Sequence, residues 1–237
     1  MRYLKTYELF KFSDELFSYN NIIDYTLLEE SATDSDIIEL CRKADQYGVK
    51  SVCVLPKHVS LAAKELESSS VLVCTVVSFP EGIDSVVSKL NETQMVINNG
   101  ADEVDMVLNY SLLQKHYEDG KDELVYEVKT LVDDCHKRTN KDGRPVILKV
   151  IVESGLLSEE ETKVATEICL EAGADFIKTS TGKVSVGAEL SKIKVMYDTI
   201  QQAGSNMKIK ASGGVRTLDQ INSMIGMVDR FGMGYAA

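Results

Sequence analysis

The stretch 146–179, VILKVIVESGLLSEEETKVATEICLEAGADFIKT, indicates the fold because it contains one complete repeat of strand, helix and strand. Two short apolar runs, 146–152 and 175–179, enclose a helical pattern at 158–172. Ser158 stands where the helix N-cap belongs, and Gly173 follows the last helical residue, as a C-terminal cap should. Such an alternation is typical of a parallel sheet whose strands are connected by helices.

The same alternation continues in both directions along the chain. We expect strands at 22–26, 51–55, 72–77, 103–108, 146–152, 175–179, 208–211 and 230–233, and helices at 34–48, 57–67, 83–99, 121–139, 158–172, 187–203 and 217–228. Asp34 is the expected N-cap of the 34–48 helix. Eight strand units in a chain of 237 residues favour an α/β fold of the closed (β/α)8 TIM-barrel type over a doubly wound sheet.

The ends of the chain modify this barrel. Residues 1–20 precede the first strand and are expected to form an added amphipathic helix, with Leu9, Phe12, Leu16 and Phe17 on one face. Residues 21–237 are expected to form a single barrel domain with a short C-terminus, because the chain ends before a full eighth helix.

Composition narrows the class of protein. With 37 acidic and 26 basic residues, the net charge of −11 argues against nucleic-acid binding. There is no apolar run of the ~18 residues that a membrane span needs, and the N-terminus lacks the apolar core of a signal peptide. The five cysteines are scattered, which favours reduced packing residues. We therefore expect a cytoplasmic protein that binds neither nucleic acid nor a membrane.

Three successive expected strands carry a lysine within an apolar run: Lys149 in ILKVI, Lys178 in FIKTS and Lys210 in KIKAS. A single lysine of this kind is more often a structural ion pair or a side chain that reaches back to solvent. Three of them on neighbouring barrel strands converge near the C-terminal mouth, where barrel active sites lie. Crowded ammonium groups lower one another's pKa, and a neutral lysine is a nucleophile. The pattern thus predicts Schiff-base chemistry on a carbon–carbon bond, with the nucleophile open among the three.

Carboxylates also occur within the expected strands, as the lysines do. Glu103 and Asp105 share one face of the 103–108 strand, and Asp105 lies deeper in the apolar stretch. Asp105 could relay protons, or it could be a structural counter-ion for the lysines, and the sequence does not separate these roles. Glu153 and Asp24 are further acidic residues at strand positions, and a structural role is favoured for Glu153.

Two glycine-containing loops suggest a phosphate site. STGK at 180–183 follows the sixth strand, and SGGVR at 212–216 follows the seventh and precedes a helix near Thr217. Backbone N–H groups at such a helix start bind phosphate, and Lys183 and Arg216 would add positive charge. FGMG at 231–234 could complete the cradle. The histidines at 58, 116 and 136 lie away from strand ends, so we expect no metal site.

The segments EVDMV at 103–107, LKVIVE at 148–153, FIKTSTGK at 176–183 and IKASGGVRT at 209–217 closely resemble the deoxyribose-phosphate aldolases. So do IDYTLL at 23–28 and VCVLP at 52–56, and the resemblance extends over about residues 20–235. It implies a metal- and cofactor-free class I aldolase with a barrel fold. Such an enzyme reversibly cleaves 2-deoxy-D-ribose 5-phosphate to D-glyceraldehyde 3-phosphate and acetaldehyde in deoxyribonucleoside catabolism, and is a homo-oligomer, with a dimer favoured.

Within that resemblance, Lys178 would form the Schiff base, Lys210 would be the neighbouring cation that lowers its pKa, and Asp105 would shuttle protons. Lys149 would belong to the same network. The resemblance places the remaining functional residues nearer the substrate (Asp24, Thr26, Cys53, Thr181) and around the phosphate (Gly182, Lys183, Gly213, Gly214, Val215, Arg216, Gly232).

Three departures from the family pattern concern phosphate affinity and substrate preference rather than reaction type. Tyr25 replaces a frequent histidine, the loop ending in Gly234 and Tyr235 lacks serines, and the C-terminus is short. Two other functions stay open on the sequence. One is a related barrel lyase that uses another aldehyde acceptor. The other is a sugar-phosphate-binding barrel that has lost its activity.

Overall fold

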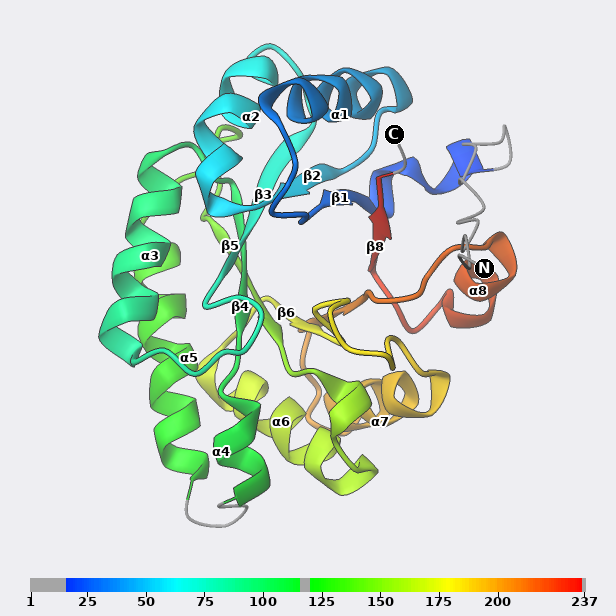
Figure 1. The fold of residues 1–237 in the computed structure, drawn as a ribbon. Helices are drawn as coiled ribbons and strands as arrows, with labels where there is room; N and C mark the ends of the chain where they lie inside the picture. Colours follow the sequence, from blue (N-terminus) through cyan, green and yellow to red (C-terminus); the bar gives the residue numbers. More distant parts are fainter. Residues whose placement is uncertain (1–15, 116–119, 236–237) are drawn as a thin grey trace, which may run out of the picture.

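Eight parallel strands form a closed barrel in the computed structural model, which describes residues 16–115 and 120–235. Each strand pairs with the next along the chain, and β8 pairs with β1 to close the ring (Figure 1). The strands are β1 Ile23–Leu27, β2 Ser51–Val54, β3 Leu72–Val77, β4 Glu103–Val107, β5 Ile147–Ile151, β6 Phe176–Lys178, β7 Lys208–Ala211 and β8 Arg230–Gly234. The predicted TIM-barrel fold is confirmed, and no strand boundary differs from the prediction by more than one residue.

Helices cover the outside of this ring. They are α1 Asp34–Tyr47, α2 Val59–Glu65, α3 Val86–Asn98, α4 Tyr110–Lys115, α5 Lys121–Cys135, α6 Glu159–Ala172, α7 Leu190–Gln202 and α8 Leu218–Met224, with short 3-10 turns η2 Pro56–His58 and η3 Ser154–Leu156. Ser158 caps α6, as predicted, and the side chain of Glu161 bonds back to the backbone N–H of Ser158. The prediction of Asp34 as the N-cap of α1 is wrong. Thr33 is the cap, and Asp34 is the first helical residue.

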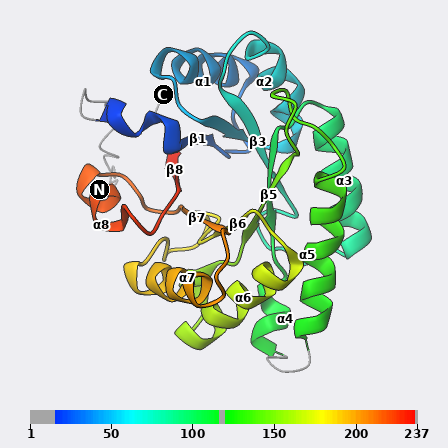
Figure 2. The same ribbon diagram turned by 180° about the vertical axis from the view of Figure 1, so that it is seen from behind.

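The segment before the barrel is a 3-10 helix, η1 Leu16–Ile22, instead of part of a regular α-helix. It lies beside α8, as Figure 2 shows from behind, and the hydroxyl of Tyr19 donates to the Asn222 side chain of α8 at 2.7 Å. The expected helical extension over 1–20 otherwise lies outside the described residues, Leu9 and Phe12 included.

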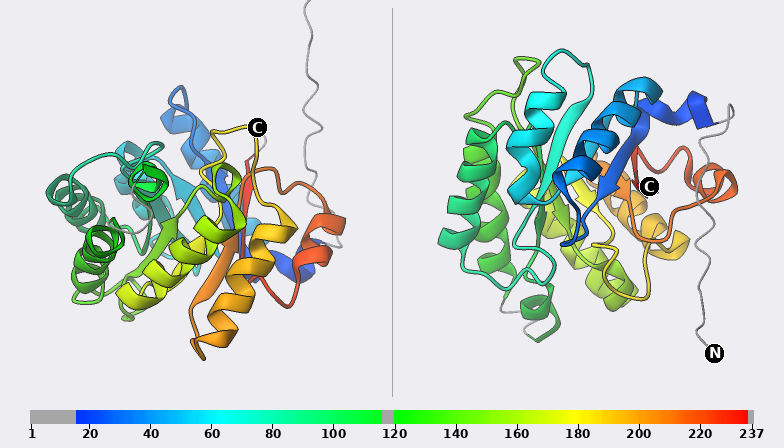
Figure 3. Two further views of the ribbon diagram at one scale, coloured as in Figure 1. Left: turned by 90° about the horizontal axis from the view of Figure 1, so that it is seen from below. Right: turned by 45° about the horizontal axis from the view of Figure 1, so that its top comes forward.

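The side chains on the two faces of the strands lie in different surroundings. Val104 and Met106 of β4 point outward into the apolar layer under the helices, whereas Glu103 and Asp105 point into the barrel. The view from below in Figure 3 (left) shows β8, in red, next to β1, in blue, and their paired register places Asp24 beside Gly232. The barrel interior thus combines a small apolar cluster around Cys53 with a set of buried charges. Among the described residues, no helix is both long and apolar enough to cross a membrane.

Candidate active site

Asp105 lies at the centre of the buried charges. One of its carboxylate oxygens accepts from Lys149 Nζ at 2.8 Å. The other accepts from Lys178 Nζ and Lys210 Nζ, each at 2.7 Å. The strand register explains this convergence, because Asp105 pairs with Lys149 and Lys178 pairs with Lys210 on the inner face of the barrel. The structure therefore brings together the three strand lysines and Asp105, as the sequence predicted.

A second ring of ion pairs surrounds this group. Asp24 contacts Lys210 Nζ and Arg230 Nη1, both at 2.5 Å. Glu103 contacts Lys149 Nζ at 2.6 Å and Arg230 Nη1 at 3.2 Å. Arg230 did not figure in the prediction of the site, although it holds two of the three carboxylates. The charge cluster is defined here as Asp24, Glu103, Asp105, Lys149, Lys178, Lys210 and Arg230.

The carboxylates change the electrostatics that three crowded lysines would have on their own. Burial by itself raises the pKa of Asp105, but the three lysines outweigh it and lower that pKa far below its usual range. Burial also tends to lower the pKa of Lys210, yet Asp105 and Asp24 raise it above its usual value. The pKa of Lys149 is likewise raised, because nearby negative groups, Asp105 first among them, outweigh the effect of burial. The expectation that crowding lowers the lysine pKa values is therefore wrong for Lys149 and Lys210, which stay protonated.

The cluster has one more cation than it has carboxylates, with Lys149, Lys178, Lys210 and Arg230 facing Asp24, Glu103 and Asp105. Charge balance is reached when one lysine is a neutral amine. Of the described carboxylates, Lys178 contacts Asp105 alone, whereas Lys210 contacts both Asp105 and Asp24.

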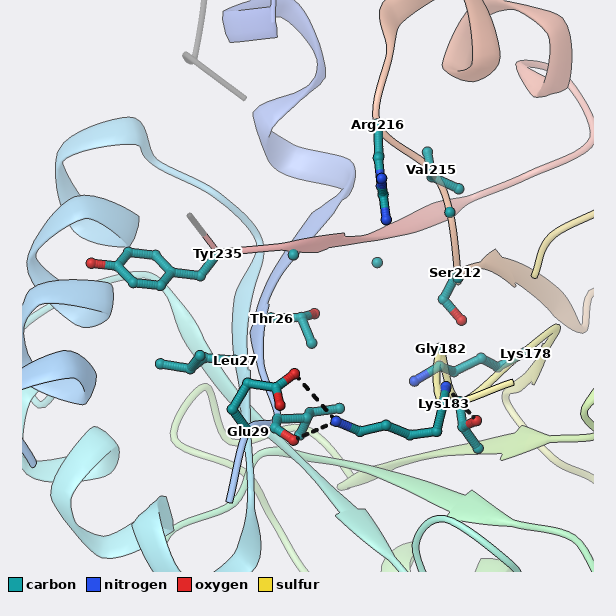
Figure 4. A pocket seen from close by; sticks show the side chains of 16 residues that line it. Thr26, Leu27, Glu29, Lys178, Gly182, Lys183, Ser212, Val215, Arg216 and Tyr235 are labelled. Atoms are coloured by element: carbon teal, nitrogen blue, oxygen red, sulfur yellow. Dashed lines mark hydrogen bonds and ion pairs between the residues drawn. The ribbon is translucent and has the colours of Figure 1, made fainter. Parts of the chain in front are cut away.

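A cavity of about 460 Å³ opens at the C-terminal ends of the strands, and Lys178 reaches into it (Figure 4). Lys178 is the last residue of β6, which places its amine at the mouth. Lys149 and Lys210 are fully buried below it and do not line the cavity. The structure thus separates three lysines that the residue pattern alone left equivalent.

The other predicted site residues fall into two groups. Most line the cavity: Thr26, Thr181, Gly182, Lys183, Gly213, Gly214, Val215, Arg216 and Gly232. Asp24 and Cys53 do not. Asp24 belongs to the charge cluster, and Cys53 is fully buried beside Cys74, its register partner on β3. Cys74, which the sequence reasoning missed, lies 3.1 Å from Asp105 and 3.3 Å from Lys149 Nζ.

The expected phosphate donors at the start of α8 are already used within the chain. The backbone N–H groups of Arg216 and Thr217 donate to the Gln220 side chain at 2.7 and 3.0 Å. Gln220 in turn donates its N–H to the Thr217 hydroxyl, which completes a capping box. The prediction that this helix start presents free N–H groups to a phosphate is wrong for those two groups.

The loops after β6 and β7 meet backbone to backbone. Ala188 donates its N–H to the Gly213 carbonyl at 2.9 Å, and Gly213 has φ +80°, a conformation that side chains disfavour. A Cβ at Gly187 would overlap the Gly213 carbonyl, so only glycine fits there. This contact sets the position of one wall of the cavity.

Replacing Gly187 with alanine is expected to raise KM by roughly tenfold or more, because it displaces the Gly213 loop from the cavity wall. Steady-state kinetics checks this. Gly234→Ala is the matched control, since Gly234 also lines the cavity but a Cβ there meets nothing within 4 Å. Equal KM changes in both variants would contradict the assigned role of the loop contact.

Glu153 supports the same wall. It follows β5 with φ 50°, and its carboxylate accepts from the backbone N–H of Thr181 at 3.2 Å and from the Thr181 hydroxyl. Burial raises its pKa, and the Thr181 hydrogen bonds oppose this shift. Thr181 lines the cavity, so Glu153 acts by positioning it.

Histidines take no part in the described cavity. His58 is buried beside α2, His136 contacts Asp175 at 3.0 Å, and His116 lies outside the described residues. Two buried groups of thiols and carboxylates, one of them Cys53, Cys74 and Asp105, have ligand atoms within 4.8 Å of one another. Their carboxylates are paired with lysine or arginine, so their negative charge is already neutralised.

The fold and the site define an α/β-barrel enzyme with a lysine amine presented to a cavity. Residues 21–234 match the model of the DeoC/LacD family aldolases. The chain therefore belongs to this aldolase family.

Proteins named deoxyribose-phosphate aldolase are among its relatives. One from Mycoplasmoides pirum is 42% identical over 208 residues, which cover 88% of this chain and 89% of the relative. One from Staphylococcus haemolyticus is 42% identical and covers 88% of each chain. The tetrameric deoxyribose phosphate aldolase structure from Aeropyrum pernix has a TM-score of 0.80 and 29% identity, covering 92% of this chain and 87% of the other.

Proposed function

We propose that the chain is a class I aldolase that reversibly cleaves 2-deoxy-D-ribose 5-phosphate to D-glyceraldehyde 3-phosphate and acetaldehyde, in deoxyribonucleoside catabolism. The observation that carries the proposal is the position of Lys178, whose amine reaches the cavity and whose one ion-pair partner among the described residues is the cluster carboxylate Asp105. Family membership and the names of the relatives support the choice of reaction and substrate.

The reaction begins when the neutral Lys178 amine attacks the aldehyde carbon of the open-chain sugar. Loss of water from this adduct gives an iminium ion, which withdraws electrons from the neighbouring carbon. Removal of the proton from the C3 hydroxyl then breaks the bond between C2 and C3. This step releases glyceraldehyde 3-phosphate and leaves an enamine on Lys178. Protonation of the enamine and hydrolysis release acetaldehyde. The iminium is the electron sink, so the cleavage needs no further cofactor.

Asp105 and Lys210 prepare Lys178 for this attack. The Lys210 ammonium remains charged because Asp105 and Asp24 raise its pKa against the effect of burial. Lys210 bonds the same Asp105 oxygen as Lys178, which fixes its positive charge beside the Lys178 amine. Asp105 orients the amine and assists proton transfer to the enamine, by way of water, once the amine has become an imine. Lys149 holds the other oxygen of Asp105.

Borohydride trapping tests this proposal. With acetaldehyde present, reduction is expected to add a two-carbon ethyl group to Lys178, detected by intact mass and located by peptide mapping. Lys149 and Lys210 are the internal controls, since both are buried below the cavity. An unchanged mass on protein that cleaves the sugar would exclude Schiff-base chemistry, and no cleavage at all would favour a binding barrel without activity.

We also infer that the chain works in the cytoplasm as a homo-oligomer, with a dimer favoured. The five cysteines are all free and buried, which suits a reducing compartment. Light scattering on the full chain tests the subunit number.

A further inference from the structure

The cavity wall contains a carboxylate that the reaction does not use. Glu29 follows β1 and lines the cavity together with Lys183 and Arg216, the two side chains expected to bind phosphate. Figure 4 shows Lys183 extended across the mouth toward Glu29. Lys183 Nζ donates to the Leu28 carbonyl at 2.9 Å and contacts Glu29 at 3.3 Å. One of the two cationic side chains is thus held by groups of the β1 loop.

Several polar groups around the cavity are already used within the chain. The N–H groups of Arg216 and Thr217 are taken by Gln220, and the Tyr235 N–H donates to the Thr26 carbonyl at 2.7 Å. Strand β8 contributes Gly232 and Gly234, which have no hydroxyl to donate. A dianionic phosphate would therefore meet Lys183 and Arg216 with the Glu29 carboxylate in the same cavity.

We propose that Glu29 is a specificity-determining residue that weakens selection for the 5-phosphate and lets the enzyme accept unphosphorylated 2-deoxyaldoses. This inference rests on the proposed aldolase function and concerns the far end of the substrate from Lys178. An unphosphorylated sugar leaves the Lys183–Glu29 pair in place. A phosphate must separate the pair to reach Lys183.

Two physical effects set the expected size of the change in phosphate binding. The Lys183–Glu29 pair is largely exposed, so opening it costs little by itself. The separated carboxylate then stays near a dianion, and this repulsion acts on phosphorylated substrates alone. At partly solvated distances of several ångströms such repulsion corresponds to roughly a five- to twentyfold change in binding.

Steady-state kinetics on both sugars tests the proposal. Glu29→Gln is expected to raise kcat/KM for 2-deoxyribose 5-phosphate roughly tenfold and to leave kcat/KM for 2-deoxyribose within about twofold. Glu30→Gln is the matched control, because Glu30 is the next residue and pairs with Lys57 outside the cavity. The control should change neither value. Equal changes on both sugars, or no change on either, would overturn the inference.

A binding measurement keeps the two proposals distinguishable. Inorganic phosphate, titrated by calorimetry, should bind the Glu29→Gln protein more tightly than the wild type by a similar factor, whether or not any sugar is cleaved. Unaltered phosphate affinity would overturn the role of Glu29 even in an active aldolase. Failure of the wild type to cleave either sugar would instead sink the proposed function. Borohydride trapping with acetaldehyde, which carries no phosphate, should be equal in both proteins and confirms that the variant is folded.

Discussion

Replacement of Lys178 by methionine is expected to lower kcat by at least ~10⁴-fold, because it removes the group that forms the covalent intermediate. Methionine matches the lysine stem in length, and Asp105 keeps its contacts to Lys149 and Lys210. The free energy of unfolding should therefore change by less than about 1.5 kcal/mol. Urea unfolding and a coupled assay for glyceraldehyde 3-phosphate measure the two quantities.

Lys57→Met is the control for this variant, since Lys57 is an exposed lysine paired with Glu30. It should retain full activity. If the Lys178→Met protein still acquires a borohydride-stable adduct with acetaldehyde, another lysine is the nucleophile, and the assignment based on the cavity is wrong.

Asparagine in place of Asp105 is expected to impair both stability and catalysis. The change leaves Lys149, Lys178 and Lys210 without their shared carboxylate, and breaking a buried charge pair costs about 3–5 kcal/mol. Loss of the group that orients the amine and aids proton transfer should lower kcat by about 10²–10⁴-fold. Chemical unfolding and steady-state kinetics check these values.

The pH dependence distinguishes a charge effect from a packing effect. The lowered pKa of Asp105 means that its stabilising contribution is present above its unfolded-state pKa of about 4 and is lost as pH falls through the folded value. In the Asp105→Asn protein, buried lysines can shed their protons as pH rises toward about 10. The stability deficit should therefore shrink at both low and high pH. A deficit that is constant with pH would indicate lost packing instead.

Most of the fold is predictable from the sequence because each strand is a short apolar run and each helix has its own period. The prediction and the structure differ at the starts of two helices, α4 and α1. Tyr110–Lys115 forms the short helix α4, which was not predicted. The Asn109 side chain before it accepts from the Leu112 N–H at 3.2 Å, and the Gln114 side chain donates to the Leu156 carbonyl of η3. Thr33 caps α1 because its hydroxyl accepts from the backbone N–H of Asp36 and its own backbone N–H donates to the Asp36 carboxylate.

The candidate site was predictable where a charged residue interrupts an apolar strand, as Lys149 and Asp105 do. Arg230 escaped this reasoning because it opens the weakest strand pattern, and only closure of β8 onto β1 brings it to Asp24, 206 positions away in the chain. Glu29 was not predicted because it lies in a loop next to other acidic residues, where no hydrophobic periodicity distinguishes one residue from the next. The capping role of Gln220 was missed although Thr217 and Gln220 have the spacing of a capping box, which the sequence shows.

The charge cluster also constrains how this sequence can diverge. Its cations outnumber its carboxylates, so exchanging a carboxylate for a neutral residue leaves buried positive charge with fewer counter-ions in the barrel interior. Neutral drift at these positions is therefore expected to proceed through coordinated double replacements. Asp24 with Arg230 and Glu103 with Lys149 are the pairs that should covary among descendants of this chain.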